Sequence, residues 1–295
     1  MKNKIKNIYE NKYKILLIIP FLLLVLALVQ IGLQATMTDS FVNKGITLKG
    51  GSTVTIENEF NIDSENLELF LQGKFDKADI AVRTITSAGQ VVAVAIDSDA
   101  QETAEIDNVV NAVKEKYPSI TKADYSIEVM GAALGKSFFK QTFIALIIAF
   151  ILMGFVVLVY FRTFVPSLAV ILAALSDIVV TLAIFNLTGM KLSTAGIAAF
   201  LMLIGYSVDT DILLSSRLLK RKEGSVMDRV YGAMKTGFTM STTTLVAITV
   251  ALIFVQSEVV KQIMIILFIG LLVDLVMTWI QNVGILRLYL ERKKK

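Results

Sequence analysis

Four aspartates stand out in the sequence because each falls inside a stretch of mostly apolar residues. They are Asp177, Asp209, Asp211 and Asp274. A charged side chain at the centre of a membrane-spanning helix costs about 2.5–3.5 kcal/mol on insertion scales, so such groups usually face a bundle interior, an ion path or a partner. The chemistry they could supply is the uptake and release of protons. The alternative is that each is protonated and bonded to a nearby Ser or Thr hydroxyl, serving only helix packing.

The spacing of Asp209 and Asp211 gives them different surroundings. They lie two positions apart, about 200° around a helix, so they cannot both face the same neighbour. Asp209 shares its face with Gly205, and the small residues Gly205 and Ser207 would let another helix approach closely. No Lys or Arg lies deep in a predicted span. The carboxyls must therefore stay protonated, bind a visiting cation, or pair with a basic group of a partner protein.

The composition places these aspartates in a membrane protein. Of the 295 residues, 55% are hydrophobic and only 18% are charged, and the mean hydropathy is +0.68. These values exclude an ordinary soluble enzyme. The chain has no Cys and no His, which excludes disulfides, thiolate nucleophiles, imidazole bases and the metal sites that need those ligands.

Six apolar stretches are long enough to cross the hydrocarbon core of a membrane, which takes about 20 helical residues. They lie near residues 15–35, 141–161, 164–187, 192–215, 237–256 and 262–286. The first is too long an apolar run for a secretory signal, so we interpret it as an uncleaved span. Lys and Arg cluster before the first stretch, between the fourth and fifth, and after the sixth. This distribution predicts that both termini are cytoplasmic.

The spans divide the chain into three parts. Residues 1–35 are the cytoplasmic N-terminus and first span, and residues 36–138 are an extracytoplasmic domain. Residues 139–295 are a five-span membrane bundle with a cytoplasmic amphipathic loop at 217–236 and a basic C-terminal tail. Within that loop, residues 225–234 carry apolar side chains on one helical face, which predicts a helix lying on the inner membrane surface.

The segment between the first two spans alternates between strand and helix patterns. Strands are predicted at 52–58, 80–86, 91–97 and 125–130, and helices at 64–75 and 102–117. The order βαββαβ is typical of a ferredoxin-like fold, which carries no activity by itself. The sequence thus predicts an α-helical membrane protein with six transmembrane helices and one extracytoplasmic α+β ferredoxin-like domain between spans one and two.

Six spans with such a domain after the first form half of the resistance-nodulation-division architecture. The segment from Gly205 through Tyr206 and Ser207 to Arg217 resembles the fourth-span signature of the SecD/SecF family of protein-export membrane proteins. Bacterial SecF members typically have Asn-Asp-Thr where this chain has residues 209–211, Asp-Thr-Asp. The sequence resembles the archaeal type, and the departure leaves open which of the two aspartates acts.

Two further segments are similar to the family. The segment 45–52 contains Gly50 and Gly51 and is similar to the motif that follows the first span. The pair lacks the spacing of a phosphate-binding loop, so we expect tight packing or backbone flexibility where the domain leaves the membrane. The segment 174–177 resembles a Leu-His-Asp stretch of the third span, with Ser176 replacing His.

The resemblance implies an accessory subunit of the Sec protein-export machinery and not an enzyme, with no cofactor and no metal. The implied partners are a SecD-like membrane protein, the Sec translocon and unfolded secreted proteins, and nothing supports binding to nucleic acid. It also implies a plasma-membrane protein whose intramembrane aspartates couple export to the proton-motive force. Two alternatives are an independent proton-coupled exporter of lipids or small molecules with the same architecture, and a passive scaffold in which the aspartates only pack.

Overall fold

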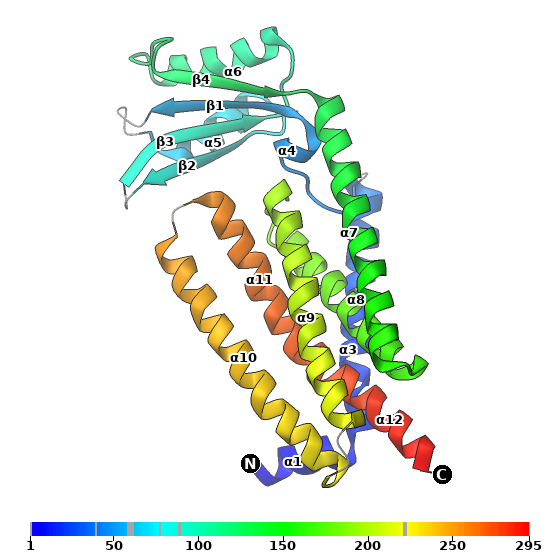
Figure 1. Cartoon of the computed structure of the whole chain (residues 1–295). Coiled ribbons are helices and arrows are strands. Elements are labelled where there is room, and N and C mark those ends of the chain that lie inside the picture. Colours follow the sequence, from blue (N-terminus) through cyan, green and yellow to red (C-terminus); the bar gives the residue numbers. More distant parts are fainter. Residues whose placement is uncertain are drawn as a thin grey trace.

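Long helices form an elongated bundle with a small domain at one end (Figure 1). This computed structural model describes residues 2–38, 40–57, 62–76, 78–87, 90–220, 223–255 and 257–294. Six helices are long and apolar enough to cross a membrane: Tyr13–Thr38, Ala132–Phe161, Phe164–Leu187, Thr194–Lys220, Val226–Phe254 and Val259–Lys293. Each contains most of one predicted span. The two ends of the chain lie at the end of the bundle away from the small domain, on opposite sides of it in this view (Figure 1).

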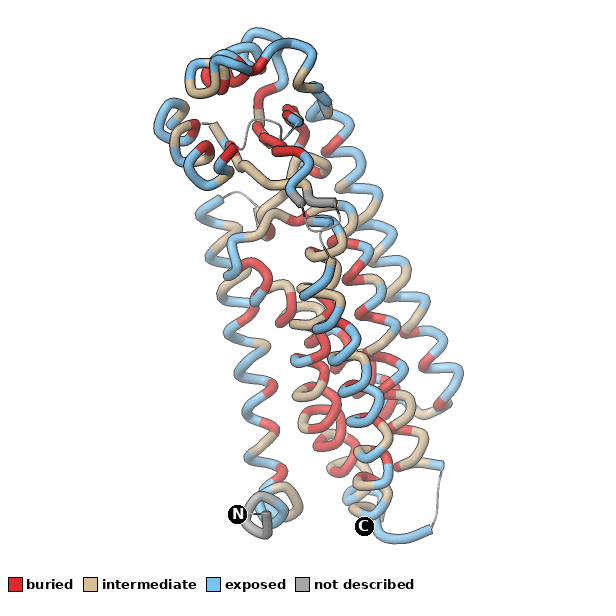
Figure 2. The backbone as a smooth tube through the Cα atoms, turned by 90° about the vertical axis from the view of Figure 1, so that its left-hand side faces the viewer, coloured by how far each residue is buried: buried red, intermediate tan, exposed pale blue. Residues whose placement is uncertain are grey.

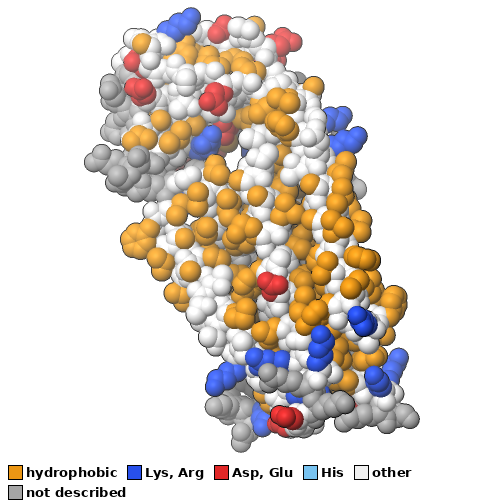
Figure 3. All heavy atoms as spheres, viewed as in Figure 1, with side chains coloured by type: hydrophobic (Ala, Val, Ile, Leu, Met, Phe, Trp, Pro, Cys, Tyr) orange, Lys and Arg blue, Asp and Glu red, His pale blue; other side chains and the backbone are white. Residues whose placement is uncertain are grey.

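The helices of the bundle differ in how deeply they are buried. In chain order they are α1 (Lys2–Asn11), α2 (Tyr13–Leu16), α3 (Ile18–Thr38), α7 (Ala132–Phe161), α8 (Phe164–Leu187), α9 (Thr194–Lys220), α10 (Val226–Phe254), α11 (Glu258–Val276), the π-helix η2 (Met277–Asn282) and α12 (Val283–Lys294). Buried residues gather on α8, α9, α11 and η2 (Figure 2). In contrast, α3, α7 and α10 expose most of their apolar side chains, and hydrophobic side chains cover the bundle face in Figure 3. Such exposure suits helices that face lipid.

Helices occupy most of the segment 217–236, which was predicted to be an amphipathic loop. Helix α9 continues to Lys220, and α10 begins immediately after Ser225. Ser225 and Asp228 form a capping box, in which each side chain accepts a hydrogen bond from the backbone N–H of the other. The apolar face that suggested a membrane-surface helix packs inside the bundle instead, where Val230 is fully buried.

The small domain is a four-stranded antiparallel sheet with two helices. Its elements are β1 (Gly51–Glu57), α5 (Ser64–Lys74), β2 (Ala81–Ser87), β3 (Gln90–Ser98), α6 (Thr103–Lys116) and β4 (Tyr125–Met130). The predicted element order is therefore observed, and the sheet order is β2-β3-β1-β4. Val54 of β1 pairs with Ile96 of β3 and with Ile127 of β4.

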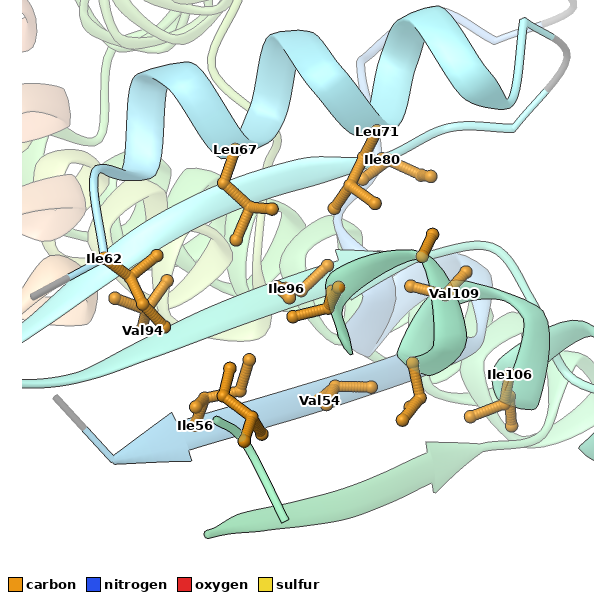
Figure 4. Close-up of a cluster of buried hydrophobic side chains, with 14 of the residues drawn as sticks. Val54, Ile56, Ile62, Leu67, Leu71, Ile80, Val94, Ile96, Ile106 and Val109 are labelled. Carbon is orange, nitrogen blue, oxygen red and sulfur yellow. The ribbon is translucent and has the colours of Figure 1, made fainter. Parts of the chain in front are cut away.

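The core of this domain lies between the helices and one face of the sheet (Figure 4). Val54 and Ile96 contribute from the two central strands, Leu67 and Leu71 from α5, and Val109 from α6. These five side chains are at most 3% exposed. Burying an aliphatic side chain of this size contributes about 1.5–3 kcal/mol, so this cluster accounts for the packing of the domain.

Glycines allow close contacts where the domain joins the bundle. The short helix α4 (Ile46–Lys49) ends at Gly50, whose φ is 89°, and Gly51 follows with φ of 142°. A Cβ at Gly51 would lie 2.2 Å from the carbonyl oxygen of Ser98, and one at Gly50 would lie 2.5 Å from the Cα of Ala132. Of the two expected uses of this pair, tight packing and backbone flexibility, these short distances favour tight packing.

Polar contacts also tie the domain to the bundle. The carboxylate of Asp79, just before β2, pairs with Lys191 between α8 and α9 at 2.5 Å and with Lys49 at 3.3 Å. Burial alone would raise the pKa of Asp79, but the two lysines outweigh it and hold this pKa below its usual value. Nearby, the backbone N–H of Leu192 donates to the carbonyl oxygen of Asn43 at 2.6 Å. The join is thus ionic and backbone-mediated.

Substitution of Gly51 by Ala should destabilise the join. The positive φ disfavours any side chain, and the new Cβ would collide with the Ser98 carbonyl. We expect a loss of about 1–3 kcal/mol, seen as a lower melting temperature of the full chain in detergent. Gly73→Ala is the matched control, because a Cβ in that exposed part of α5 meets nothing within 4 Å. Equal melting temperatures for the two variants would contradict the close contact.

Candidate functional site

Three of the four intramembrane aspartates meet in the centre of the bundle. Asp177 comes from α8, Asp211 from α9 and Asp274 from α11, and all three are 0% exposed. The hydroxyl of Ser207, also on α9, donates to Oδ2 of Asp177 at 2.5 Å. Residues almost one hundred positions apart in the sequence thus meet in one buried acidic cluster, which we define as Asp177, Asp211 and Asp274.

Thr278 of η2 lies between two of these carboxyls. Its Oγ1 is 3.0 Å from Oδ1 of Asp211 and 2.9 Å from Oδ1 of Asp274. A hydroxyl has one hydrogen, so it can donate to only one of them. For both contacts to be hydrogen bonds, the other carboxyl must be protonated and donate to Thr278. Asn282 adds a second donor to Oδ1 of Asp211 at 2.7 Å.

Protons can be distributed over the carboxyl groups of the acidic cluster in more than one way. Asp177 and Asp274 are neighbours within the cluster, and two buried carboxylates near each other cannot both ionise readily. Each of the three aspartates has one carboxyl oxygen without a hydrogen-bond partner among the described residues. Within that same part of the chain, no Lys or Arg forms an ion pair with any of them. This chemistry suits storing and passing protons.

Small residues let the helices approach closely enough to form the cluster. A Cβ at Gly270 of α11 would lie 2.5 Å from a methyl carbon of Leu203 on α9. A Cβ at Gly237 of α10 would lie 2.2 Å from the ring of Trp279, which belongs to η2. Close approach through glycine is a common way of packing membrane helices. Here it brings α9 and η2, which carry Asp211 and its donors, into direct contact with their neighbours.

The π-helix and two of its polar residues were not predicted. Gln281 donates to the hydroxyl of Ser176 at 3.1 Å, and Asn282 reaches Asp211, both from full burial. The sequence did carry a signal for them, because Thr278, Gln281 and Asn282 are polar residues in an otherwise apolar span. Of the hydroxyls expected near the aspartates, Ser207 and Thr278 bond to them. The hydroxyl of Thr181 has no hydrogen-bond partner in the described residues.

Asp209 lies apart from the acidic cluster. It is exposed on the outer face of α9 with Met202 and Gly205, and a Cβ at Gly205 would meet nothing within 4 Å. Figure 3 shows an isolated acidic side chain within the hydrophobic surface of the bundle. Asp209 is thus exposed, whereas Asp211, two positions later, is fully buried.

The other residues of the fourth-span motif connect α9 to α10. The hydroxyl of Tyr206 donates to the hydroxyl of Ser241 at 3.2 Å. The guanidinium of Arg217 donates to the carbonyl oxygen of Gly232 and, at 2.8 Å, to the hydroxyl of Thr236. Both side chains therefore make contacts between helices and do not touch the acidic cluster.

Comparison with known proteins identifies the family of the chain. The family model of the C-terminal region of the protein-export membrane proteins SecD and SecF matches residues 109–292. The chain belongs to the SecD/SecF family. The protein-export membrane protein SecF of Pyrococcus furiosus is 38% identical over 294 residues, covering 100% of this chain and 97% of that protein. SecF of Methanocaldococcus jannaschii is also 38% identical, covering 96% and 98%.

Solved structures of SecDF share the fold with this SecD/SecF family member. The crystal structure of SecDF, a translocon-associated membrane protein from Thermus thermophilus, matches with a TM-score of 0.71 and 22% identity. A crystal structure of SecDF in a super-membrane-facing form matches with a TM-score of 0.59 and 20% identity. The matches cover 96% and 94% of this chain, but only 38% of either SecDF chain.

Replacing Thr278 by Val should test its position between two carboxyls. Val keeps the branched shape but removes the hydroxyl, leaving Asp274 and Asp211 each with one contact fewer. An unsatisfied buried polar group costs about 1–3 kcal/mol, so the melting temperature of the purified chain in detergent should fall. Thr249→Val is the matched control, since that exposed hydroxyl only bonds back to Leu245 of its own helix. A fall of the same size in both variants would count against the arrangement.

Proposed function

We propose that this chain is an accessory subunit of the Sec protein-export machinery in the plasma membrane. In this proposal it pairs with a SecD-like membrane protein at the translocon and assists the movement or release of unfolded secreted proteins. The observation that carries the proposal is the similarity to SecF proteins along the entire chain, at 38% identity. The role is mechanical, so it requires neither enzymatic catalysis nor a cofactor.

The buried acidic cluster supports coupling of this work to the proton-motive force. A proton that enters between Asp177 and Asp274 could pass through the Thr278 hydroxyl toward Asp211, changing the charge balance among three helices. One elementary charge crossing 100 mV supplies about 2.3 kcal/mol. That energy biases an equilibrium between two conformations by tens of fold. It is enough to drive a change in how α8, α9 and α11 pack.

The open face of α9 supports a partner helix. Gly205 and Asp209 are exposed there, although the helix is apolar enough to span a membrane. A carboxyl on such a face is costly in lipid and is better placed against another protein. Six spans also form half of the pseudo-symmetric bundles in which ion paths lie between repeats. A SecD-like protein with its own six spans would supply the other half.

The small domain is proposed to be ferredoxin-like and extracytoplasmic. Its βαββαβ order and sheet order β2-β3-β1-β4 support the first point. The second rests on the basic segments near the termini, which favour cytoplasmic termini and leave residues 36–138 outside.

Substitution of the clustered aspartates should separate coupling from packing. In cells or vesicles with the SecD-like partner, Asp211→Asn keeps the shape but removes the titrating group. We expect it to lower proton-motive-force-dependent export at least about tenfold, as loss of one coupling step of 1.4 kcal/mol or more would do. Asp107→Asn, on the exposed face of α6, is the control. Normal export kinetics with unchanged proton dependence in Asp177, Asp211 and Asp274 variants would leave the passive scaffold as the better account.

The orientation can be tested because the chain has no Cys. Single variants Ser119→Cys in the small domain and Glu291→Cys in the tail place a thiol on exposed positions at opposite ends of the molecule. A membrane-impermeant maleimide added to intact cells should label position 119 and not position 291. Permeabilised cells should show labelling of both. Labelling of position 291 alone in intact cells would reverse the proposed topology.

A further inference from the structure

A cavity of about 390 Å³ opens between α3, α7 and α8. Both α3 and α7 pack against α8, and the cavity occupies the groove between them. All of its lining side chains are apolar, and they include Leu28 of α3, Phe143 and Phe150 of α7, and Ile178 of α8. A wholly apolar cavity among membrane-spanning helices suits a hydrocarbon chain and offers nothing to a polar ligand.

Aromatic rings and a lysine form the end of this cavity that faces the small domain. The rings of Phe41, Phe139 and Phe143 lie with centroids 5.5–6.0 Å apart. The ammonium group of Lys44 lies 4.3 Å from the centroid of the Phe139 ring. Lys44 therefore marks the point where the apolar cavity meets a polar surface.

A second lysine, Lys136, lies near Lys44. Burial and the nearby charge of Lys136 together lower the pKa of Lys44. Among the described residues, no ion pair involves either Lys44 or Lys136. Lys136 lies one helical turn before Phe139 on α7, and Lys44 lies over the Phe139 ring. An anion bound between the two ammonium groups would offset their mutual repulsion.

A polar pocket of about 370 Å³ adjoins the same lysine. Its lining includes Asn43, Lys44, Lys49, Lys191 and Asp79. Asp79, the single carboxylate among the described lining residues, is already paired with Lys49 and Lys191, so these described residues carry an excess of positive charge. Phe41 lines the apolar cavity, and Lys44, three residues later, lines the polar pocket. Together the cavity and the pocket have the shape and polarity of a site for an amphiphile with a negative head group.

We propose that this is a binding site for an anionic phospholipid of the surrounding membrane, with one hydrocarbon chain in the apolar cavity and its phosphate on Lys44 and Lys136. A free phosphate ion would leave the cavity unfilled, and an apolar helix of a partner would leave the two lysines unpaired. The lipid is a resident ligand. It fills the groove between α3 and α7 beside the join of domain and bundle, and the proposal does not depend on the role in export.

Native mass spectrometry of the full chain in detergent tests the site. With added phosphatidylglycerol or phosphatidylcholine, we expect one phosphatidylglycerol molecule to be retained preferentially. The double variant Lys44→Gln/Lys136→Gln should weaken this retention at least about tenfold. The double variant Lys12→Gln/Lys235→Gln removes two exposed lysines elsewhere. It is the matched control and should retain phosphatidylglycerol as the wild type does. Ile178→Trp, which fills the cavity, should lower retention of both lipids if its melting temperature shows that it remains folded.

Several results would overturn the proposal. Equal retention of phosphatidylglycerol in the wild type and in Lys44→Gln/Lys136→Gln would remove the head-group site. An equal loss in the control double variant would mean that the lipid binds through general charge alone. If inorganic phosphate displaced the bound lipid and Ile178→Trp did not change lipid retention, the polar pocket would be assigned to a soluble anion. A lipid-free dimer as the main species would assign the groove to a second copy of the chain.

Discussion

Buried carboxyl groups without a basic partner constrain the packing of the whole membrane bundle. Asp177, Asp211 and Asp274 arise from three helices and are fully buried, so each needs protons or hydrogen-bond donors from a neighbouring element. Ser207 and Thr278 supply hydroxyls, and helix η2 must lie close enough to bring Thr278 to two acids at once. The close contacts at glycines and the central position of α8 and α9 follow from this requirement. The remaining helices can be apolar on most of their surface, because they complete the wall around the acids and meet lipid on the other side.

The same helices reach the small domain through a short connection. Lys191 lies in the turn between α8 and α9, the helices that carry Asp177 and Asp211, and its ammonium group pairs with Asp79 of the domain. A relative shift of α8 and α9 therefore acts directly on an ion pair at the join. The backbone bond from Leu192 to Asn43 lies beside it. One turn therefore connects the helices that carry Asp177 and Asp211 to the small domain, through one ion pair and one backbone hydrogen bond.

Much of this arrangement follows from the sequence, and the part that does not depends on tertiary contacts. The six spans were predictable because a bilayer demands long apolar helices. The order of strands and helices along the domain was predictable because alternation and helical spacing differ in period. The opposite orientation of Asp209 and Asp211 follows from helix geometry alone. The convergence of Asp177 and Asp274 on Asp211 could not be predicted, since no local pattern encodes which helices are neighbours. The packing of Val230 within the bundle could not be predicted either, because an apolar helical face has the same pattern whether it meets lipid or protein.

Helix η2 also fixes the position of everything that follows it. A π-helical turn contains one residue more than an α-helical turn, which offsets the succeeding helix by about 100°. With this offset, Arg287 of α12 donates to the carbonyl oxygens of Tyr9 and Glu10 at 3.0 and 2.7 Å, while the Tyr9 hydroxyl donates to the carbonyl oxygen of Trp279 at 2.7 Å. Loss of one residue between Asp274 and Arg287 would restore a regular helix and turn the guanidinium away from the first helix of the chain. The number of residues in this segment is therefore constrained as well as the identity of its polar residues, because a deletion or insertion would move Arg287 away from both carbonyl oxygens.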